Sequence, residues 1–152
     1  MKKGFTLIEM LIVMAVVSIL IAIIIPSYRG MQNDAWNAKA VKEAQTIAVA
    51  VESYYRHHNR YPNRLDELLT ARPTILYKLP DDPWKTSEET DGTYGYIKGT
   101  TAGFGDYYII YSKSIDNEDD VKNRSNVTGG ALHLPAGSDD IVQSNLPVEK
   151  DL

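Results

Sequence analysis

The sequence predicts an α+β protein in which a long N-terminal helix packs against a small antiparallel sheet. Three observations point to this fold class. An aliphatic stretch runs from Met10 to Ile25, and a helical pattern continues from Ser27 to about residue 60. Alternating tyrosines then mark strands between Thr93 and Lys113. The 152 residues suffice for one modest folded domain but not for two.

The N-terminal element predicts a membrane span behind a short basic leader. Met1 to Gly4 contains Lys2 and Lys3, which should hold this end on the cytoplasmic side. Phe5 to Ile25 supplies about the 20 residues that a helix needs to cross a bilayer. Pro26 ends the aliphatic run.

Glu9 is unusual inside this apolar segment. An unpaired carboxylate costs about 2.5–3.5 kcal/mol or more near the membrane centre and less near its edge. A secretory signal peptide would need a small-x-small cleavage site after the apolar region, and residues 22–28 lack one. A plain single-pass anchor, with Glu9 reaching the headgroups, is an alternative that the residues alone leave open.

Residues from Ser27 to Arg60 continue the helix. One apolar face is predicted from positions i, i+4, i+7 and i+11, which are Ala44, Ala48, Val51 and Tyr55. This face should pack on the C-terminal domain. Pro26 removes one backbone donor and Gly30 weakens the helix nearby, so we expect local kinking or melting around Pro26.

A short second helix is expected after Tyr61-Pro62. Asn63 is placed to cap a helix from Arg64 to about Ala71, and Pro73 stops it. The residues expected to pack inward from this helix are Leu65, Leu68 and Leu69.

Three strands are expected in the C-terminal half. The first two run from Thr93 to Lys98 and from Asp106 to Lys113, with a loop from Gly99 to Gly105 between them. A third short strand lies near Ala131 to Leu134. Together they form a small antiparallel sheet against the long helix.

Composition narrows the function classes. The formal net charge of −4 gives no basic field that would favour nucleic acid. The absence of cysteine rules out disulfides and thiol chemistry and leaves the redox compartment open.

No Ser/His/Asp set, phosphate-binding loop or paired catalytic acid stands out, so we do not expect an enzyme. His57 and His58 are adjacent and point about 100° apart on a helix, so they do not easily share a metal ion.

The segment Lys3-Gly4-Phe5-Thr6-Leu7-Ile8-Glu9 resembles the class III signal of type IV pilins and type II secretion pseudopilins. The resemblance implies that a prepilin peptidase cuts between Gly4 and Phe5, and that Phe5 is then N-methylated. Pro26 falls where many of these proteins place a helix-bending proline. The chain would then consist of a leader (1–4), a transmembrane and polymerisation helix (5–26) and a soluble pilin-like domain (27–152).

The second half resembles the major pseudopilin of the type II secretion system. The similar features, in order, are Tyr61-Pro62, Leu79-Pro80, Asp82-Pro83-Trp84, Tyr94-x-Tyr96, Gly105-Asp106-Tyr107 and Ser112 with Asp116. Lys85 stands where that family usually has glycine after the tryptophan, and 113–120 is acidic where the family is glycine-rich. A type IV pilin from another system therefore stays open.

The resemblance implies a role for Glu9 in assembly. Cleavage would leave a positive amine on Phe5, and a carboxylate in a low-dielectric environment needs a cationic partner. In a filament, Glu9 of an incoming subunit can meet the Phe5 amine of a subunit already assembled, which would favour one axial register. Pairing within one subunit is the competing possibility.

Asp116, Glu118, Asp119 and Asp120 crowd one loop. Oxygen ligands at this spacing suit Ca²⁺, although the EF-hand pattern is not matched. A solvated acidic loop is the alternative. The resemblance implies calcium, because major pseudopilins carry it in the corresponding loop, and Asp139-Asp140-Ile141 would return to this loop as the similar family segment does.

The resemblance implies a filament subunit held in the inner membrane by one span, with its C-terminal domain outside the cytoplasm. Its partners would be copies of itself, the prepilin peptidase, an inner-membrane assembly platform, minor pilins and membrane lipid. The implied function is a type II secretion pseudopilus that drives protein export. The alternatives are a pilin for adhesion, motility or DNA uptake, and a membrane-anchored extracytoplasmic binding domain that never polymerises.

Overall fold

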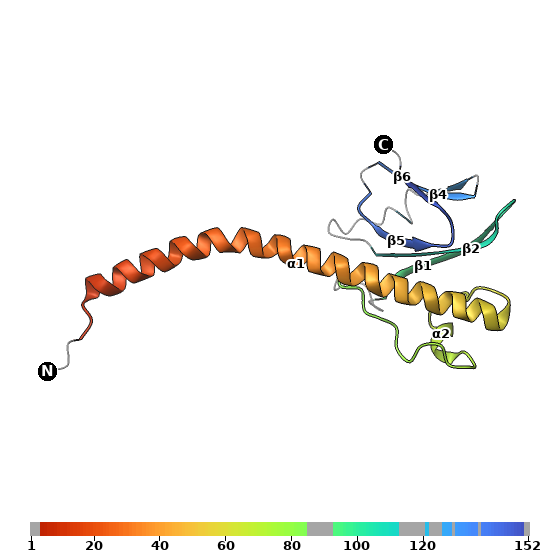
Figure 1. Cartoon of the computed structure of the whole chain (residues 1–152), viewed down its shortest axis with the longest axis horizontal. Helices are drawn as coiled ribbons and strands as arrows, with labels where there is room; N and C mark the ends of the chain where they lie inside the picture. Colours follow the sequence, from red (N-terminus) through yellow and green to blue (C-terminus); the bar gives the residue numbers. More distant parts are fainter. Residues whose placement is uncertain are drawn as a thin grey trace. The chain divides into compact units, whose positions relative to one another are not determined.

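The computed structural model describes residues 4–84, 93–112, 121, 126–128, 130–136 and 138–150. The chain forms two compact units, Met1–Ala35 and Trp36–Leu152. The first holds the beginning of helix α1, and the second holds the rest of α1 together with every other element (Figure 1).

Helix α1 runs from Leu7 to His58 over 52 residues. It ends where Asn59 adopts a left-handed backbone with φ of 52°, and its N–H donates to the Tyr55 carbonyl at 2.7 Å, as at many helix C-termini. The melting expected around Pro26 is wrong, because the backbone is helical on both sides of this residue. A proline removes only one hydrogen bond, and the neighbouring residues keep theirs.

The buried face of α1 is centred on Ile47 rather than on Ala48. Ala44 and Val51 are fully buried as predicted, but Tyr55 is 36% exposed and Tyr54 takes its place in the core. The four predicted positions lie along one edge of the buried face and not along its centre. They therefore include Tyr55, which is exposed.

Helix α2 is shorter than predicted and spans Glu67–Thr70. Asn63 does not cap it: the Glu67 carboxylate accepts a bond from the Asn63 N–H at 2.9 Å, and the Asn63 Oδ1 accepts one from Lys98 at 2.9 Å. Leu68 is fully buried as predicted.

The first sheet has the order β1-β2-β5 and is antiparallel throughout. Its strands are β1 (Gly95–Thr101), β2 (Gly105–Ser112) and β5 (Ile141–Ser144). The hairpin between β1 and β2 is tighter than predicted, because Thr101 already pairs with Gly105. Gly103 and Gly105 have φ values of 99° and 92°, which glycine adopts without steric cost.

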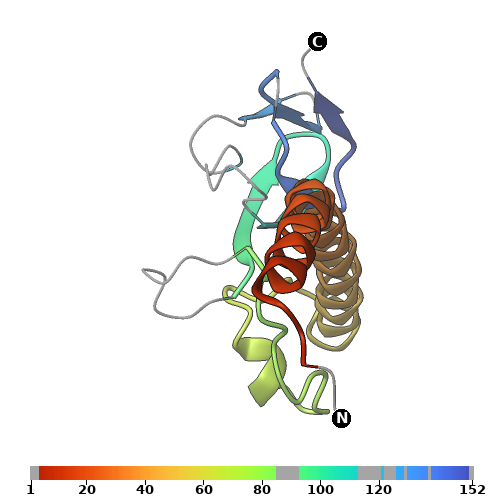
Figure 2. The same ribbon diagram turned by 90° about the vertical axis from the view of Figure 1, so that its left-hand side faces the viewer.

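A second sheet with the order β3-β4-β6 extends the fold beyond the prediction. It contains β3 (Asn126–Thr128), β4 (Ala131–Leu134) and β6 (Val148–Lys150), and β4 pairs with β6 in parallel. Only β4 was expected from the sequence. Figure 1 shows the first sheet lying along α1, with β4 and β6 on its other side, and Figure 2 shows the same layers along the helix.

The central strand β2 is therefore covered on both faces. Tyr108 and Ile110 pack with the α1 residues, whereas Ile109 and Tyr111 pack with Leu132 of the second sheet. These alternate positions of β2 form the link between two hydrophobic clusters.

Candidate membrane and assembly site

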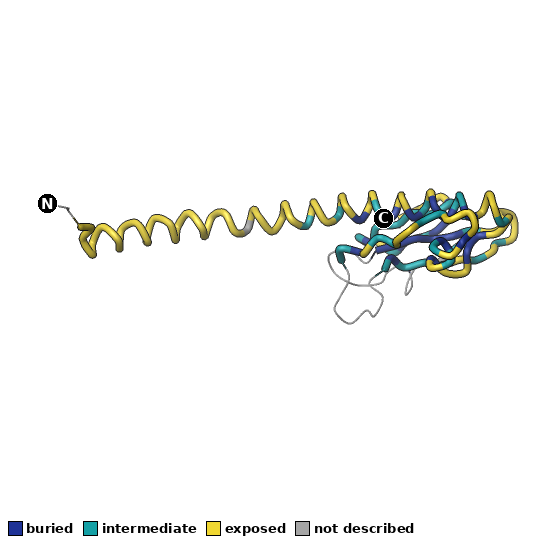
Figure 3. The backbone as a smooth tube through the Cα atoms, turned by 90° about the horizontal axis from the view of Figure 1, so that it is seen from below, coloured by how far each residue is buried: buried dark blue, intermediate teal, exposed yellow. Residues whose placement is uncertain are grey.

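The first unit consists of an apolar helix that nothing in its own unit covers. Every described side chain from Phe5 to Ile25 is exposed, as the yellow tube in Figure 3 shows. The helix is long and apolar enough to cross a membrane, a test that a signal sequence near an N-terminus also passes. Its stretch from Leu7 to Ile25 would span about 28 Å at 1.5 Å per residue, close to the thickness of a bilayer core.

Thr6 and Glu9 form a reciprocal cap at the start of α1. The Thr6 N–H and hydroxyl donate to Glu9 Oε2 at 2.8 and 2.7 Å, and the Glu9 N–H donates back to Thr6 Oγ1 at 3.3 Å. This is the capping box, in which a threonine and a glutamate three residues later satisfy free N–H groups. The sequence reasoning missed it, although the Thr-x-x-Glu spacing was visible.

The cap gives the Glu9 carboxylate hydrogen-bond donors inside its own chain. It does not give Glu9 a cation, because the Phe5 nitrogen is an uncharged amide in the full-length chain. Phe5 itself is 80% exposed, and a side chain at Gly4 would have nothing within 4 Å. The predicted cleavage pair thus lies in an open segment ahead of the helix.

The predicted calcium residues Asp116, Glu118, Asp119 and Asp120 lie outside the described residues. The described residues on either side of them donate hydrogen bonds to buried carboxylates. The Ser112 hydroxyl donates to Asp82 Oδ1 at 2.8 Å, and the Val121 N–H donates to Asp140 Oδ2 at 3.0 Å. The expected return of Asp139-Asp140-Ile141 to this loop stays a prediction, because residues 113–120 lie outside the described part of the chain.

The described part of the chain holds no group of three or more His, Asp or Glu side chains placed to bind a metal. His57 and His58 point apart, as expected. The His58 ring stacks on Tyr54 with 4.1 Å between centroids, whereas His57 lies with its Nδ1 2.8 Å from the Ser53 carbonyl oxygen.

Tyrosines bonded to carboxylates hold the second unit together. Tyr94 donates to Glu43 at 2.9 Å, and Tyr54 donates to Glu67 at 2.7 Å. Burial raises the pKa of Tyr61 to about 12, and the nearby Glu52 carboxylate adds to that rise. Burial alone would raise the pKa of Glu67, but hydrogen bonds from Tyr54, Asn63 and Arg60 outweigh it and lower the pKa below its ordinary value.

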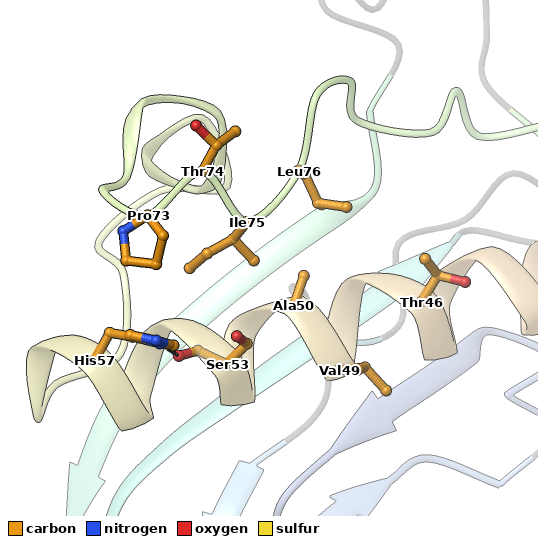
Figure 4. Close-up of a pocket in the computed structure, with 9 residues that line it drawn as sticks. All are labelled: Thr46, Val49, Ala50, Ser53, His57, Pro73, Thr74, Ile75 and Leu76. Carbon is orange, nitrogen blue, oxygen red and sulfur yellow. Dashed lines mark hydrogen bonds between the residues drawn. The ribbon is translucent and has the colours of Figure 1, made fainter.

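A surface groove of about 310 Å³ lies between α1 and the segment that follows α2 (Figure 4). Its lining combines aliphatic side chains with a few neutral polar groups and one histidine. The residues are Thr46, Val49, Ala50, Ser53, His57, Pro73, Thr74, Ile75 and Leu76. Val49 of α1 is 70% exposed, as single aliphatic side chains on protein surfaces often are.

Comparison with known proteins supports the predicted resemblance at both ends of the chain. A family model described as the prokaryotic N-terminal methylation motif matches residues 1–25. Type II secretion system core protein G of Aeromonas hydrophila is 29% identical over 142 residues, which cover 80% of this chain and 92% of that protein. No solved structure matches the chain.

Two further relatives match shorter parts. Type II secretion system core protein G of Pectobacterium carotovorum subsp. carotovorum is 29% identical over 56% of this chain and 64% of its own length. Type IV major pilin protein PilE1 of Neisseria gonorrhoeae is 37% identical over 73 residues, 48% of this chain and 44% of that protein. The resemblance to type IV pilins and to the major pseudopilin is thereby confirmed.

Proposed function

We propose that this chain, a homologue of type II secretion core protein G and of type IV pilins, is a structural subunit of a type IV pilus-like filament. The filament is a type II secretion pseudopilus that drives protein export. The proposal rests first on one observation: the uncovered apolar stretch of α1 from Leu7 to Ile25, in which Glu9 is the single charged residue, is joined to a folded unit. A water-soluble protein would have to bury such a helix, and a plain anchor has no need of the carboxylate.

The leader ends at Gly4, and removal of residues 1–4 exposes the Phe5 amine for methylation. We expect Gly4→Val to leave the leader attached, because a protease subsite shaped for glycine rejects a branched side chain. Mass spectrometry of membrane-extracted protein, made with and without a prepilin peptidase, decides this. A wild-type chain that keeps Met1 while the peptidase is active would contradict the proposed class.

Assembly pairs Glu9 of one subunit with the Phe5 amine of another. Glu9→Val should enter the membrane at least as well as the wild type, because it removes a charge from the apolar segment. It should nevertheless form few filaments or filaments of irregular register, because the partner amine lacks its carboxylate. Electron microscopy of sheared filaments measures both, and wild-type number and symmetry from Glu9→Val would exclude the pairing.

Lys2 and Lys3 place the N-terminus in the cytoplasm and the second unit outside it. The inner membrane holds the subunit before assembly, and the prepilin peptidase, the assembly platform and the minor pilins are its protein partners. The chain has no catalytic role. Protease accessibility of the second unit in spheroplasts tests the orientation.

A type IV pilin is the second candidate, and the match of 73 residues to the Neisseria pilin favours it. Deleting the gene separates the two, because loss of an exported protein indicates a pseudopilus and loss of surface fibres indicates a pilus. A processed chain that forms no filaments in either setting would indicate a non-polymerising membrane anchor.

Calcium is part of the proposal for the second unit. Asp116, Glu118, Asp119 and Asp120 would hold it, and it would neutralise their mutual repulsion. The chemistry of the donors fits a hard cation, and the buried Asp140 carboxylate contacts Val121 directly after this acidic run. The full chain in micelles should melt at a higher temperature with millimolar calcium than with chelator, and Asp116→Ala should remove the difference.

A further inference from the structure

We propose that Tyr55 and Tyr61 form a site of oxidative modification, at which a one-electron oxidant joins their two rings into a dityrosine. The new bond ties the last turns of α1 to the segment that follows the helix. The chain has no cysteine, so a disulfide is not available for this purpose. The inference does not depend on the proposed filament, because both residues belong to the second unit of a single chain.

The two rings are in contact. Their centroids are 4.6 Å apart and their planes are inclined by 33°, at the short end of the range of about 4.5–7 Å in which aromatic rings interact. Tyr61 also contacts Tyr108 at 5.0 Å, but there the planes are inclined by 62° and an edge meets a face. An oxidised tyrosine carries part of its unpaired electron on the ring carbons beside the hydroxyl, and these carbons must meet for coupling. Planes that are closer to parallel favour such a meeting between Tyr55 and Tyr61.

The two tyrosines differ in exposure. Tyr55 is 36% exposed, so an oxidant in the solvent reaches its ring, whereas Tyr61 is only 6% exposed. Tyr61 loses its electron to the oxidised ring of Tyr55, with which it is in contact. Tyr55 is therefore where the oxidant acts, and Tyr61 is the ring to which it becomes joined.

Glu52 supplies a base for Tyr61. The Tyr61 hydroxyl donates to Glu52 Oε1 at 3.4 Å and accepts from Asn145 Nδ2 at 3.2 Å. A phenol that loses an electron must also give up its proton, because a charged ring is costly in a buried position. The Glu52 carboxylate takes this proton along the hydrogen bond that already exists.

The reaction consumes two equivalents of oxidant. The first takes an electron from Tyr55, whose phenolic proton goes to water. The Tyr55 radical then regains an electron from Tyr61 and a proton from water, while the Tyr61 proton passes to Glu52 and on to solvent. The second equivalent oxidises Tyr55 again. The two radicals couple through a carbon–carbon bond, the joined carbons release their hydrogens as protons, and the two oxygens take protons up. The product lacks two hydrogen atoms relative to the two separate tyrosines.

Trypsin separates the two tyrosines, so mass spectrometry detects the bond directly. The enzyme cleaves at the basic residues around the pair, which are Lys42, Arg56, Arg60 and Arg64. The full-length chain in micelles is oxidised with tris(bipyridine)ruthenium, persulfate and light, and the protein that migrates as a monomer is digested. Peptides 43–56 and 61–64 should appear joined, two hydrogen atoms below the sum of their masses and with the fluorescence of dityrosine.

Three variants test the assignment. Tyr55→Phe should abolish the joined peptides, because phenylalanine resists this oxidant. Tyr77→Phe is the matched control and should keep the full yield, since Tyr77 is 96% exposed and has no ring contact within the described residues. Glu52→Gln should lower the yield several-fold, because an amide hydrogen-bonds to Tyr61 without taking its proton.

The opposite results overturn the proposal. Joined peptides from Tyr55→Phe would place the bond on Tyr54, which lies in the same tryptic peptide, and would exclude Tyr55. Oxidised wild-type chain without the joined peptides, or with them only in covalent dimers, excludes a bond within one chain. An undiminished yield from Glu52→Gln contradicts the transfer of the proton to Glu52. Each result leaves the proposed filament unaffected, because the oxidised chain is monomeric.

Discussion

The two units use the same helix in opposite ways. In the second unit, α1 turns small and aliphatic side chains such as Ala44 and Ile47 inward, and both are fully buried. In the first unit, the stretch of α1 from Met10 to Ile25 is apolar on nearly every side and exposes its side chains, as Ile19 does with 62% of its surface. The difference shows that the two parts of α1 need different surroundings, because a helix that is hydrophobic on all sides must be covered by something other than its own folded unit.

The largest expected effect on stability comes from replacing a buried isoleucine of α1, compared with an exposed isoleucine of the same helix. Ile47→Ala should lower the free energy of unfolding of the second unit by about 2–5 kcal/mol, because it leaves a cavity in the core. Ile19→Ala, its matched control, should leave the melting temperature of this unit unchanged. Thermal unfolding in micelles measures both, and equal losses would mean that the first unit also packs on protein in the isolated chain.

The next effect concerns the first sheet. Gly99 pairs with Tyr107 across β1 and β2, and a Cβ at Gly99 would collide with the tyrosine hydroxyl. Gly99→Ala should therefore cost about 1–3 kcal/mol of stability through overpacking. Gly30→Ala in the first unit, where a Cβ meets nothing within 4 Å, is the control and should be neutral or slightly stabilising. Denaturant unfolding of the two variants supplies the comparison.

A smaller effect is expected at the cap of the first unit. Thr6→Val removes the hydroxyl that exchanges bonds with Glu9, which should cost about 1 kcal/mol of local helix stability. Faster amide hydrogen exchange at the start of α1 would reveal this loss, whereas Thr6→Ser should retain wild-type rates. The melting temperature of the second unit should stay constant in both variants. Unchanged exchange in Thr6→Val would show that the capping box does not stabilise the helix.

The last effect appears only in alkali, where the second unit should lose stability. The folded state holds the proton of Tyr61 to about pH 12, whereas an unfolded tyrosine ionises near pH 10. Since the unfolded state binds fewer protons between these values, the stabilisation is complete below about pH 10 and disappears as the pH rises through about 12. Melting curves against pH should show a shallower decline in Tyr61→Phe than in the wild type. Tyr77 is exposed, and Tyr77→Phe is the control. If the melting temperature of this variant also declines less steeply with pH, the effect does not come from the burial of Tyr61.

Much of the fold could be predicted because its signals are local. The apolar run and the helical periodicity after it predicted α1, and the alternating tyrosines predicted β1 and β2. The strands β3, β5 and β6 were missed because they are short, with three or four residues each, and their partners are remote in sequence. Such strands gain their stability from pairing, which a single stretch of residues does not reveal.

The candidate site divides in the same way. The roles of Gly4, Phe5 and Glu9 were predicted from the resemblance of Lys3–Glu9 to the class III signal. The bonds between Thr6 and Glu9 could have been predicted from spacing, because a cap involves only neighbouring residues. The groove between Val49 and Ile75 could not be predicted from the sequence, since its two walls meet only after the chain has folded back along α1.

The sequence by itself determined that one end of this protein is an apolar helix with a single carboxylate, because hydrophobicity and charge are properties of the residues. Only the tertiary structure decided that the tyrosines of β2 serve two cores, since Tyr108 and Tyr111 read alike in the sequence. Their faces were assigned by the pleat and by the sheet that covers each side. The tertiary structure also left Val49 exposed beside buried Ala50, because the walls of a groove are set by long-range packing and not by residue type.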